Sequence, residues 1–131
     1  MAFQGSAPTG KGFWFAPTVV LAKSPSDRCM AEEIFGPVVT VYPFETEAEA
    51  IELANGTEYG LSGSIWTRDL GRGIRVSRAV QSGNLAVNSH SSLRYTTPFG
   101  GMKQSGMGRE LGPDAPIHFT EEKVVFYNSN S

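Results

Sequence analysis

The sequence has very little cysteine, because Cys29 is the single thiol among its 131 residues. One cysteine excludes an internal disulfide and any metal site built from cysteines. Basic charge is also scarce, with 11 Lys+Arg against 13 Asp+Glu and no cluster of either sign. Nucleic-acid-binding proteins normally carry a basic patch, so we expect no nucleic-acid partner.

Two further absences concern the membrane and secretion. No apolar run in the sequence approaches the roughly 20 residues that a membrane-spanning helix needs. The first residues lack the charged and then apolar pattern of a secretory signal, so we expect a cytoplasmic protein with no membrane partner. What is present is a 40% share of hydrophobic residues and a formal net charge of -2. That composition and length suit one ordinary globular unit.

Apolar runs rich in β-branched residues predict strands that alternate with helices. Such alternation predicts an α/β fold, with a partial parallel sheet and right-handed crossover helices. A polar connection at residues 24–30 has room for one helical turn. The predicted strands occupy residues 17–21, 38–43, 63–67 and 84–88.

Two helices have recognisable ends in the sequence. Thr46, followed three residues later by Glu49, forms a capping box that starts the first helix, and Gly56 suits its end. Asp69 can cap the second helix, which we expect over residues 70–81. Two glycines near the start of this second helix should weaken its first turns.

The remaining segments are predicted to be loops or extended chain. Residues 1–12 are expected to be a flexible N-terminal segment, and residues 89–104 form a long loop of the kind that often carries function. A helix that begins near residue 106 should be broken by the prolines before residue 119. Residues 123–127 are apolar enough for a last strand, which we expect to pair with another subunit.

The stretch around Glu33 and Phe35 is the main candidate for a site. It ends in the turn signal Gly36-Pro37, and a predicted buried strand follows. Side chains at the mouth of a strand in an α/β protein often contact ligands. From the residues alone, the alternative that the glutamates are solvated and Phe35 is part of the core is the better one.

Five motifs give the chain a resemblance to the NAD(P)-dependent aldehyde dehydrogenase superfamily. They occur in the order and with the spacing of that family, and the similarity runs from about residue 12 to residue 127, whereas residues 1–4 do not resemble it. Together the motifs are highly specific. They are EEIFGPV at 32–38, NGTEYGL at 55–61, GNLAVN at 83–88, PFGGMKQSG at 98–106 and GRELG at 108–112.

The resemblance covers only the C-terminal portion of such enzymes. It implies that residues 13–108 are the end of the catalytic domain and that residues 109–131 are the tail joining the oligomerisation region. The parent enzyme would oxidise an aldehyde to a carboxylic acid with NAD or NADP, through a cysteine thioester, as a homodimer or homotetramer. The fragment lacks the nucleophile and is expected to be inactive alone. The alternative is a standalone, non-catalytic binding or assembly module derived from such an enzyme.

The resemblance also implies roles for individual residues. Glu33 would accept hydrogen bonds from the hydroxyls of the nicotinamide ribose, as an ionised carboxylate can do for a vicinal diol. Phe35 would pack against the nicotinamide end of the cofactor. Phe99 would line the aldehyde tunnel of the full enzyme. The choice between NAD and NADP depends on upstream residues. The resemblance does not specify the aldehyde, although residues 88–92 and 96–99 favour enzymes that act on aminoaldehydes or similar small aldehydes.

Other residues are assigned to the substrate pocket or to structural roles. His90 and Tyr95 could tune the choice of aldehyde, although exposed loop residues without a role are an equal alternative. Asn88 would hold the following loop through backbone hydrogen bonds. Arg109 and Glu121 would help to tie the catalytic and oligomerisation parts together near a subunit interface.

Three other catalytic or binding interpretations are set aside. Cys29 lies close to Glu33, far from where the family has its nucleophile, and is interpreted as a buried small hydrophobic residue. The glycines at 100–108 lack the Lys and Ser/Thr of a phosphate-binding loop and the third glycine of a dinucleotide fingerprint. The run Ser-His-Ser-Ser at 89–92 has no acid placed to orient the histidine, which argues against a hydrolase.

Overall fold

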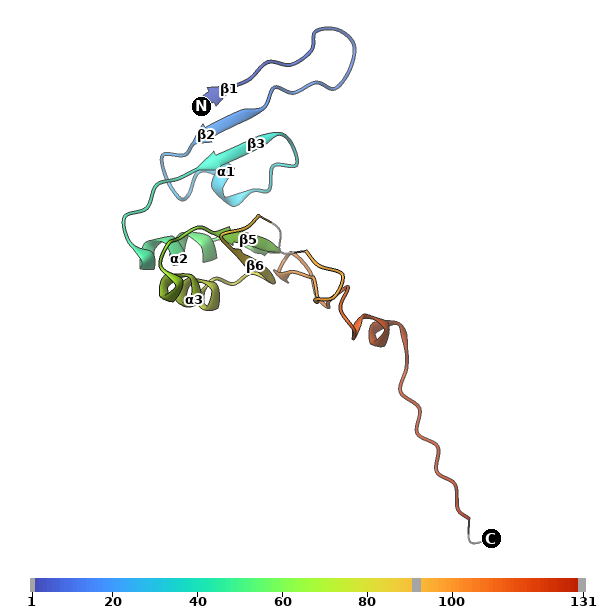
Figure 1. Ribbon diagram of the computed structural model, residues 1–131. Helices are drawn as coiled ribbons and strands as arrows, with labels where there is room; N and C mark the ends of the chain where they lie inside the picture. The colour runs from blue at the N-terminus through green and yellow to red at the C-terminus, as the bar shows by residue number, and fades with distance from the viewer. Residues whose placement is uncertain (1, 91–92, 130–131) are drawn as a thin grey trace. The chain divides into compact units, whose positions relative to one another are not determined.

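The computed structural model describes residues 2–90 and 93–129 of the chain (Figure 1). The chain divides into two compact units, each described here by itself. Unit 1 comprises Met1–Glu58 and Ile74–Gln81, and unit 2 comprises Tyr59–Gly73 and Ser82–Ser131. Parallel strand pairs and short helices occur among the described residues, which confirms the α/β class. The strands are divided among three small sheets, however, and do not form one continuous parallel sheet.

Unit 1 contains a three-stranded sheet in the order β1-β2-β3. Strand β2 (Thr18–Leu21) runs parallel to β3 (Val38–Val41), so that Thr18 lies opposite Val38, and the two arrows lie side by side in Figure 1. Strand β1 (Phe3–Gln4) pairs with β2 in the antiparallel direction. The N-terminal segment therefore includes a short strand that its sequence does not predict, while residues 5–12 carry no helix or strand.

The single predicted helical turn before β3 is present as α1 (Arg28–Ala31). Asp27 precedes it, and its carboxylate accepts hydrogen bonds from the backbone N–H groups of Lys23 (2.8 Å) and Ser24 (3.1 Å). These two bonds stabilise the charged form and lower the pKa of Asp27 below its ordinary value. On the other side, the hydroxyl of Thr40 donates to the carbonyl oxygen of Cys29 at 2.9 Å. The turn is thereby attached to β3.

Helix α2 (Glu47–Asn55) begins as its capping box predicts. The hydroxyl of Thr46 accepts a hydrogen bond from the N–H of Glu49 at 3.1 Å, and the carboxylate of Glu49 accepts from the N–H of Glu45 at 2.7 Å. Gly56 is the C-cap, as expected. Local signals of this kind satisfy the first N–H groups of a helix, which have no partners within it.

Helix α3 (Leu70–Ala79) starts after Asp69, whose carboxylate accepts from the N–H of Arg72 at 3.1 Å. It ends two residues earlier than predicted, because the amide side chain of Asn55 takes the backbone groups at its end. Asn55 donates to the carbonyl of Ala79 (3.0 Å) and accepts from the N–H of Gln81 (2.7 Å). This contact lies within unit 1.

Unit 2 contains two pairs of strands. Strand β5 (Ser62–Ile65) runs parallel to β6 (Asn84–Val87), and β4 (Tyr59–Gly60) pairs with β7 (Met102–Lys103) in the antiparallel direction. The buried Gly73 of α3 packs close to β6, since a Cβ atom there would lie 3.1 Å from a methyl group of Val87. This glycine weakens the helix intrinsically, but it permits close packing.

One expectation for the C-terminal part is wrong. No α-helix begins near residue 106, because Gly106, Gly108 and Gly112 have positive φ angles of 122°, 79° and 71°, which are incompatible with a right-handed helix. A 3-10 helix, η1 (Ala115–Phe119), follows instead. Residues 123–127 pair with no described residue, as expected for a segment whose partner would be another subunit. Whether they pair with another subunit stays a prediction.

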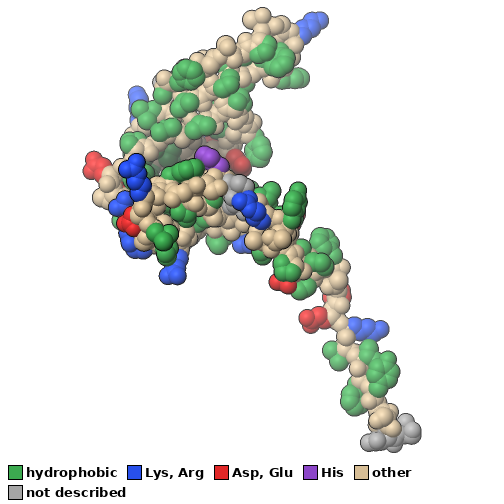
Figure 2. All heavy atoms as spheres, in the orientation of Figure 1, with side chains coloured by type: hydrophobic (Ala, Val, Ile, Leu, Met, Phe, Trp, Pro, Cys, Tyr) green, Lys and Arg blue, Asp and Glu red, His purple; other side chains and the backbone are tan. Residues whose placement is uncertain are grey.

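Both units bury little apolar surface. The buried hydrophobic residues of the described chain are Ala22 and Ala86, whereas large apolar side chains such as Phe13 and Phe126 are almost fully exposed. Figure 2 shows many hydrophobic side chains at the surface of the face in view. Within residues 2–90 and 93–129, no helix has the length and apolar character needed to cross a membrane.

The cap of α2 generates a stability prediction. Replacing Thr46 with alanine removes the acceptor for the N–H of Glu49, so we expect the free energy of unfolding to fall by about 1 kcal/mol. Thr46→Ser keeps a hydroxyl acceptor and should change stability by less than about 0.5 kcal/mol. Urea denaturation followed by far-UV circular dichroism measures both values. Equal losses of unfolding free energy in the two variants would show that the hydroxyl acceptor of the cap contributes nothing to stability.

Candidate functional site

The segment that carries Glu33 and Phe35 is a short connection between α1 and β3. Its path is set by backbone hydrogen bonds from Gly36 to the carbonyl of Ile34 (2.7 Å) and from Thr18 to the carbonyl of Pro37 (2.9 Å). The second bond attaches the turn to β2. Because this turn is fixed between α1 and β3, the side chains of the connection are held at the surface of unit 1.

Phe35 is 94% exposed, so the interpretation that it belongs to the core is wrong for the described chain. Glu33 is exposed as well and forms no hydrogen bond or ion pair with the described residues. The two side chains therefore present a carboxylate acceptor and a flat apolar ring at the surface of unit 1. A polyhydroxylated ligand with an aromatic ring could use both.

The neighbouring Glu32 has a different environment. Its carboxylate accepts two hydrogen bonds from the guanidinium of Arg28, each 2.8 Å long. This pairing lowers the pKa of Glu32 below its ordinary value, chiefly through the side-chain hydrogen bond. Both partners are exposed, so the pair adds little to stability. Glu32, the C-cap residue of α1, is therefore paired with Arg28, whereas Glu33 is not paired with a described residue.

Phe99 lies in unit 2 and is half-buried. Its backbone forms an isolated antiparallel bridge with Glu110, in which the N–H of each residue donates to the carbonyl of the other at 2.7 Å. The side chain of Asn84 also binds the peptide groups on both sides of Phe99. The sequence assigns no role to Asn84, although Asn84 and its partners lie in two of the five motifs, because nothing in the sequence shows that these motifs meet.

Glycines make this arrangement possible. A Cβ atom at Gly83 would overlap the carbonyl oxygen of Gly100, and one at Gly100 would lie 2.6 Å from the carbonyl oxygen of Gly108. The close approach of backbone segments requires glycine at both positions. Gly106 and Gly108 also have positive φ angles. The close contacts and these angles support the interpretation that the glycines are turn and packing residues and do not form a phosphate-binding loop.

Arg109 is half-buried and serves the same region. Its Nη1 atom donates to the carbonyl oxygens of Gly101 (2.9 Å) and Gly108 (2.6 Å). It forms no ion pair with Glu121 in the described chain, and Glu121 is exposed. The guanidinium thus stabilises the loop after Phe99 directly, through backbone carbonyls that would otherwise lack partners.

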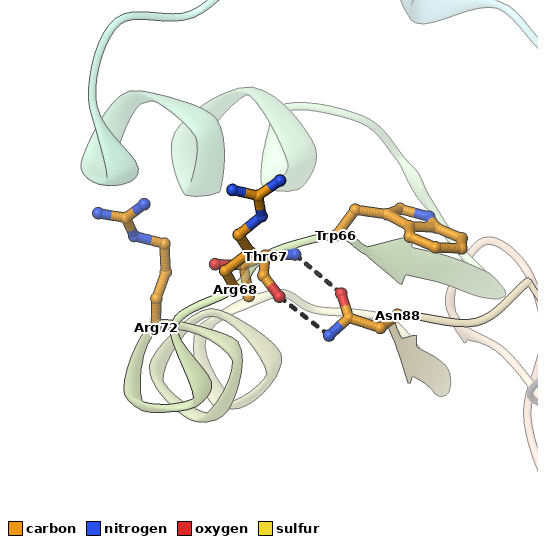
Figure 3. A pocket seen from close by; sticks show the side chains of 5 residues that line it. All are labelled: Trp66, Thr67, Arg68, Arg72 and Asn88. Atoms are coloured by element: carbon orange, nitrogen blue, oxygen red, sulfur yellow. Dashed lines mark hydrogen bonds between the residues drawn. The ribbon is translucent and has the colours of Figure 1, made fainter.

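Asn88 lines an open hollow of about 810 Å³ in unit 2 (Figure 3). The amide of Asn88 accepts from the N–H of Thr67 and donates to its carbonyl, both at 2.9 Å. Asn88 has a φ of 54°, which turns the chain away from β6. The ring of His90 lies 4.9 Å from that of Trp66, centroid to centroid. Trp66 lines the hollow, so His90 has a defined neighbour even though it is exposed.

Two arginine side chains, those of Arg68 and Arg72, also line the hollow. Figure 3 shows the guanidinium groups of Arg68 and Arg72 pointing away from the amide of Asn88. The hollow is open and does not enclose a small molecule. Ser91 and Ser92, which complete the Ser-His-Ser-Ser run, lie outside the described residues.

The described residues offer no metal centre. Cys29 is half-buried, which is less than its interpretation as a buried hydrophobic residue implies. Residues 2–90 and 93–129 contain no group of three or more His, Cys, Asp or Glu side chains that could hold a metal ion. Glu33 and Phe35 belong to unit 1, whereas Asn88, His90, Phe99 and Arg109 belong to unit 2.

Comparison with known proteins gives consistent matches. The sequence model of the Aldehyde dehydrogenase family matches residues 1–125, so the expectation that residues 1–4 lie outside the resemblance is wrong. An aldehyde dehydrogenase of Emericella nidulans is 42% identical over 127 residues, which is 97% of this chain and 26% of the relative. Human 2-aminomuconic semialdehyde dehydrogenase is 44% identical over 114 residues, or 87% of this chain and 23% of the relative.

Solved structures agree with these relatives. A double mutant of betaine aldehyde dehydrogenase from Staphylococcus aureus, in complex with NAD+, matches 99% of this chain with a TM-score of 0.89 and 41% identity. The NAD+ complex of an aldehyde dehydrogenase from Bacillus cereus matches 98% with a TM-score of 0.90 and 40% identity. The chain covers 27% and 26% of those two structures. It therefore spans about a quarter of the length of the proteins it matches.

The backbone contact between Gly83 and Gly100 generates a second stability prediction. Gly83→Ala forces the two segments apart, and we expect a loss of about 1–3 kcal/mol in the free energy of unfolding. Gly36→Ala is the matched control, since a Cβ atom there meets nothing within 4 Å. Chemical denaturation of both variants measures the difference. An unchanged stability in Gly83→Ala would contradict the packing described.

Proposed function

This chain belongs to the aldehyde dehydrogenase family, and we propose that it is the C-terminal part of an oxidoreductase that converts an aldehyde to a carboxylic acid. The parent enzyme would use NAD or NADP and a cysteine thioester, with the cysteine supplied by a part of the enzyme outside these residues. The chain would contribute cofactor and substrate contacts, and the tail of a homodimer or homotetramer, in the cytoplasm. Residues 13–108 and 109–131 correspond to these two parts.

The observation that carries the proposal is the exposed pair of Glu33 and Phe35. The carboxylate of Glu33 is not used by any described residue, whereas that of Glu32 is paired with Arg28. A free carboxylate can accept hydrogen bonds from both hydroxyls of the nicotinamide ribose. The exposed ring of Phe35 can limit the tilt of the nicotinamide. The cofactor, when bound, supplies the acceptor for the hydride that leaves the aldehyde carbon.

The second group of residues would act on the aldehyde side. Phe99 offers an apolar ring on a backbone fixed by the bridge to Glu110, and we assign it to the wall of the substrate tunnel. His90, in contact with Trp66, would tune the choice of aldehyde. Asn88, Arg109 and Glu121 have structural roles, the first two through backbone hydrogen bonds.

The chain without its parent should have no dehydrogenase activity, because it contains no catalytic cysteine motif. We expect the isolated 131-residue chain to produce no NADH from aldehydes, and the native gene product to do so. An antibody raised against the chain, used on extracts of the source cells, measures the mass of that product. A native product of 14.1 kDa would overturn the proposal and favour a standalone module that binds through its exposed apolar side chains.

Glu33 generates a binding prediction in the active native product. Glu33→Gln removes a charged acceptor, and we expect the dissociation constant for the cofactor to rise by about tenfold, since a hydrogen bond to a charged group contributes roughly 1.5–3 kcal/mol. Glu32→Gln is the matched control, because Glu32 is already paired with Arg28. Titration of cofactor fluorescence gives both constants. If Glu32→Gln weakens binding as much as Glu33→Gln, the assignment of Glu33 is wrong.

A further inference from the structure

The side chain of Asn84 holds the backbone around Phe99. Its Nδ2 atom donates to the carbonyl oxygen of Pro98 at 3.1 Å, and its Oδ1 atom accepts from the N–H of Gly100 at 3.0 Å. We propose that Asn84 is a positioning residue that fixes Phe99 and thereby sets the size of aldehyde that the enzyme accepts. The inference rests on the proposed function, because it needs Phe99 to line the substrate path.

Phe99 is held from both edges of its backbone. Its own N–H and carbonyl bind Glu110 at 2.7 Å each. In extended chain, the peptide groups of successive residues point to opposite edges, so the groups of Pro98 and Gly100 point away from Glu110. The amide of Asn84 satisfies them on that second edge. Four hydrogen bonds thus determine where the Phe99 backbone lies.

Asn84 is itself firmly placed. It is the first residue of β6, lies opposite Ser62 of β5, and its N–H donates to the carbonyl of Leu61 at 3.0 Å. The preceding Gly83 makes close backbone contact with Gly100. Asparagine is disfavoured in strands, so its presence at this position indicates a use for the amide. Through this side chain, the backbone at Phe99 is held at a fixed position relative to the β5–β6 pair.

Without these bonds, the backbone at Phe99 would be held by hydrogen bonds on one edge, through the bridge to Glu110. Gly100 and Gly101 follow Phe99 directly, and glycine has a wider choice of backbone conformations than other residues. The aromatic ring would then sample several positions. An enzyme with a mobile wall should lose discrimination between small and bulky aldehydes, while the chemical step itself needs no contact with Asn84.

Asn55 provides a matched control within the same chain. Its amide makes the same pair of bonds around Val80, donating to Ala79 and accepting from Gln81. It belongs to unit 1, whereas Phe99 belongs to unit 2. Asn55→Ala therefore removes an equivalent pair of hydrogen bonds and should reduce stability without affecting the choice of aldehyde.

The experiment measures kcat/KM of the native gene product for a small aliphatic aldehyde and a bulky aromatic aldehyde. For Asn84→Ala, we expect the ratio of the two values to change by roughly five- to thirtyfold, as the loss of one or two hydrogen bonds predicts. Asn84→Asp keeps the acceptor for Gly100 and the shape of the side chain but replaces the donor to Pro98 with an oxygen, so it should fold and change the ratio in the same direction as Asn84→Ala. Asn55→Ala should leave the ratio at the parent value.

A double variant tests whether Asn84 acts through Phe99. Phe99→Ala removes the ring, so adding Asn84→Ala to it should change the ratio no further. Equal losses for both aldehydes in Asn84→Ala, or additive effects in the double variant, would overturn the inference while leaving the proposed function intact. Absence of aldehyde oxidation in the unmodified native product would overturn the proposed function, and this inference with it.

Discussion

Backbone groups that leave regular strands and helices still need hydrogen-bond partners, and in this protein asparagine side chains supply many of them. An asparagine amide presents a donor and an acceptor side by side, as a peptide group does. Asn55 ends α3, Asn84 holds the chain at Phe99, and Asn88 binds both backbone groups of Thr67. These contacts, with Arg109 on the carbonyls of Gly101 and Gly108, allow long irregular segments to keep a defined path.

This arrangement explains how a chain with so little buried apolar surface can present a definite site. Ala22 and Ala86 are the buried hydrophobic residues of the described ranges, and most large apolar side chains are exposed. Packing alone therefore does little to fix the loops. The exposed aromatic rings support the proposal that the chain is part of a larger enzyme, in which other surfaces would cover them.

Local signals in the sequence predict the starts of helices correctly. The start of α2 follows from Thr46 and Glu49, which are three residues apart, and the start of α3 from Asp69. The sequence does not predict elements whose hydrogen-bond partners are distant in the chain or whose backbone angles are unusual. Strand β1 is too short to show a period, and the helix expected near residue 106 is prevented by left-handed glycines. Of the site residues, Glu33, Phe35 and Phe99 came from family resemblance, since their chemistry alone favours ordinary solvated or core roles.

The order of the amino acids is enough to indicate the α/β class, the residues at which the two helices begin, and membership of a family whose motifs occur in order along nearly the whole chain. These properties depend on neighbouring residues or on direct comparison of residues. The folded arrangement of the chain is needed to show that Phe35 is exposed, that Glu32 is paired and Glu33 is not, and that Asn84 binds the backbone around Phe99. The bonds of Asn84 join residues 14 and 16 positions apart, and no local preference of the backbone indicates which distant peptide group a side-chain amide will meet.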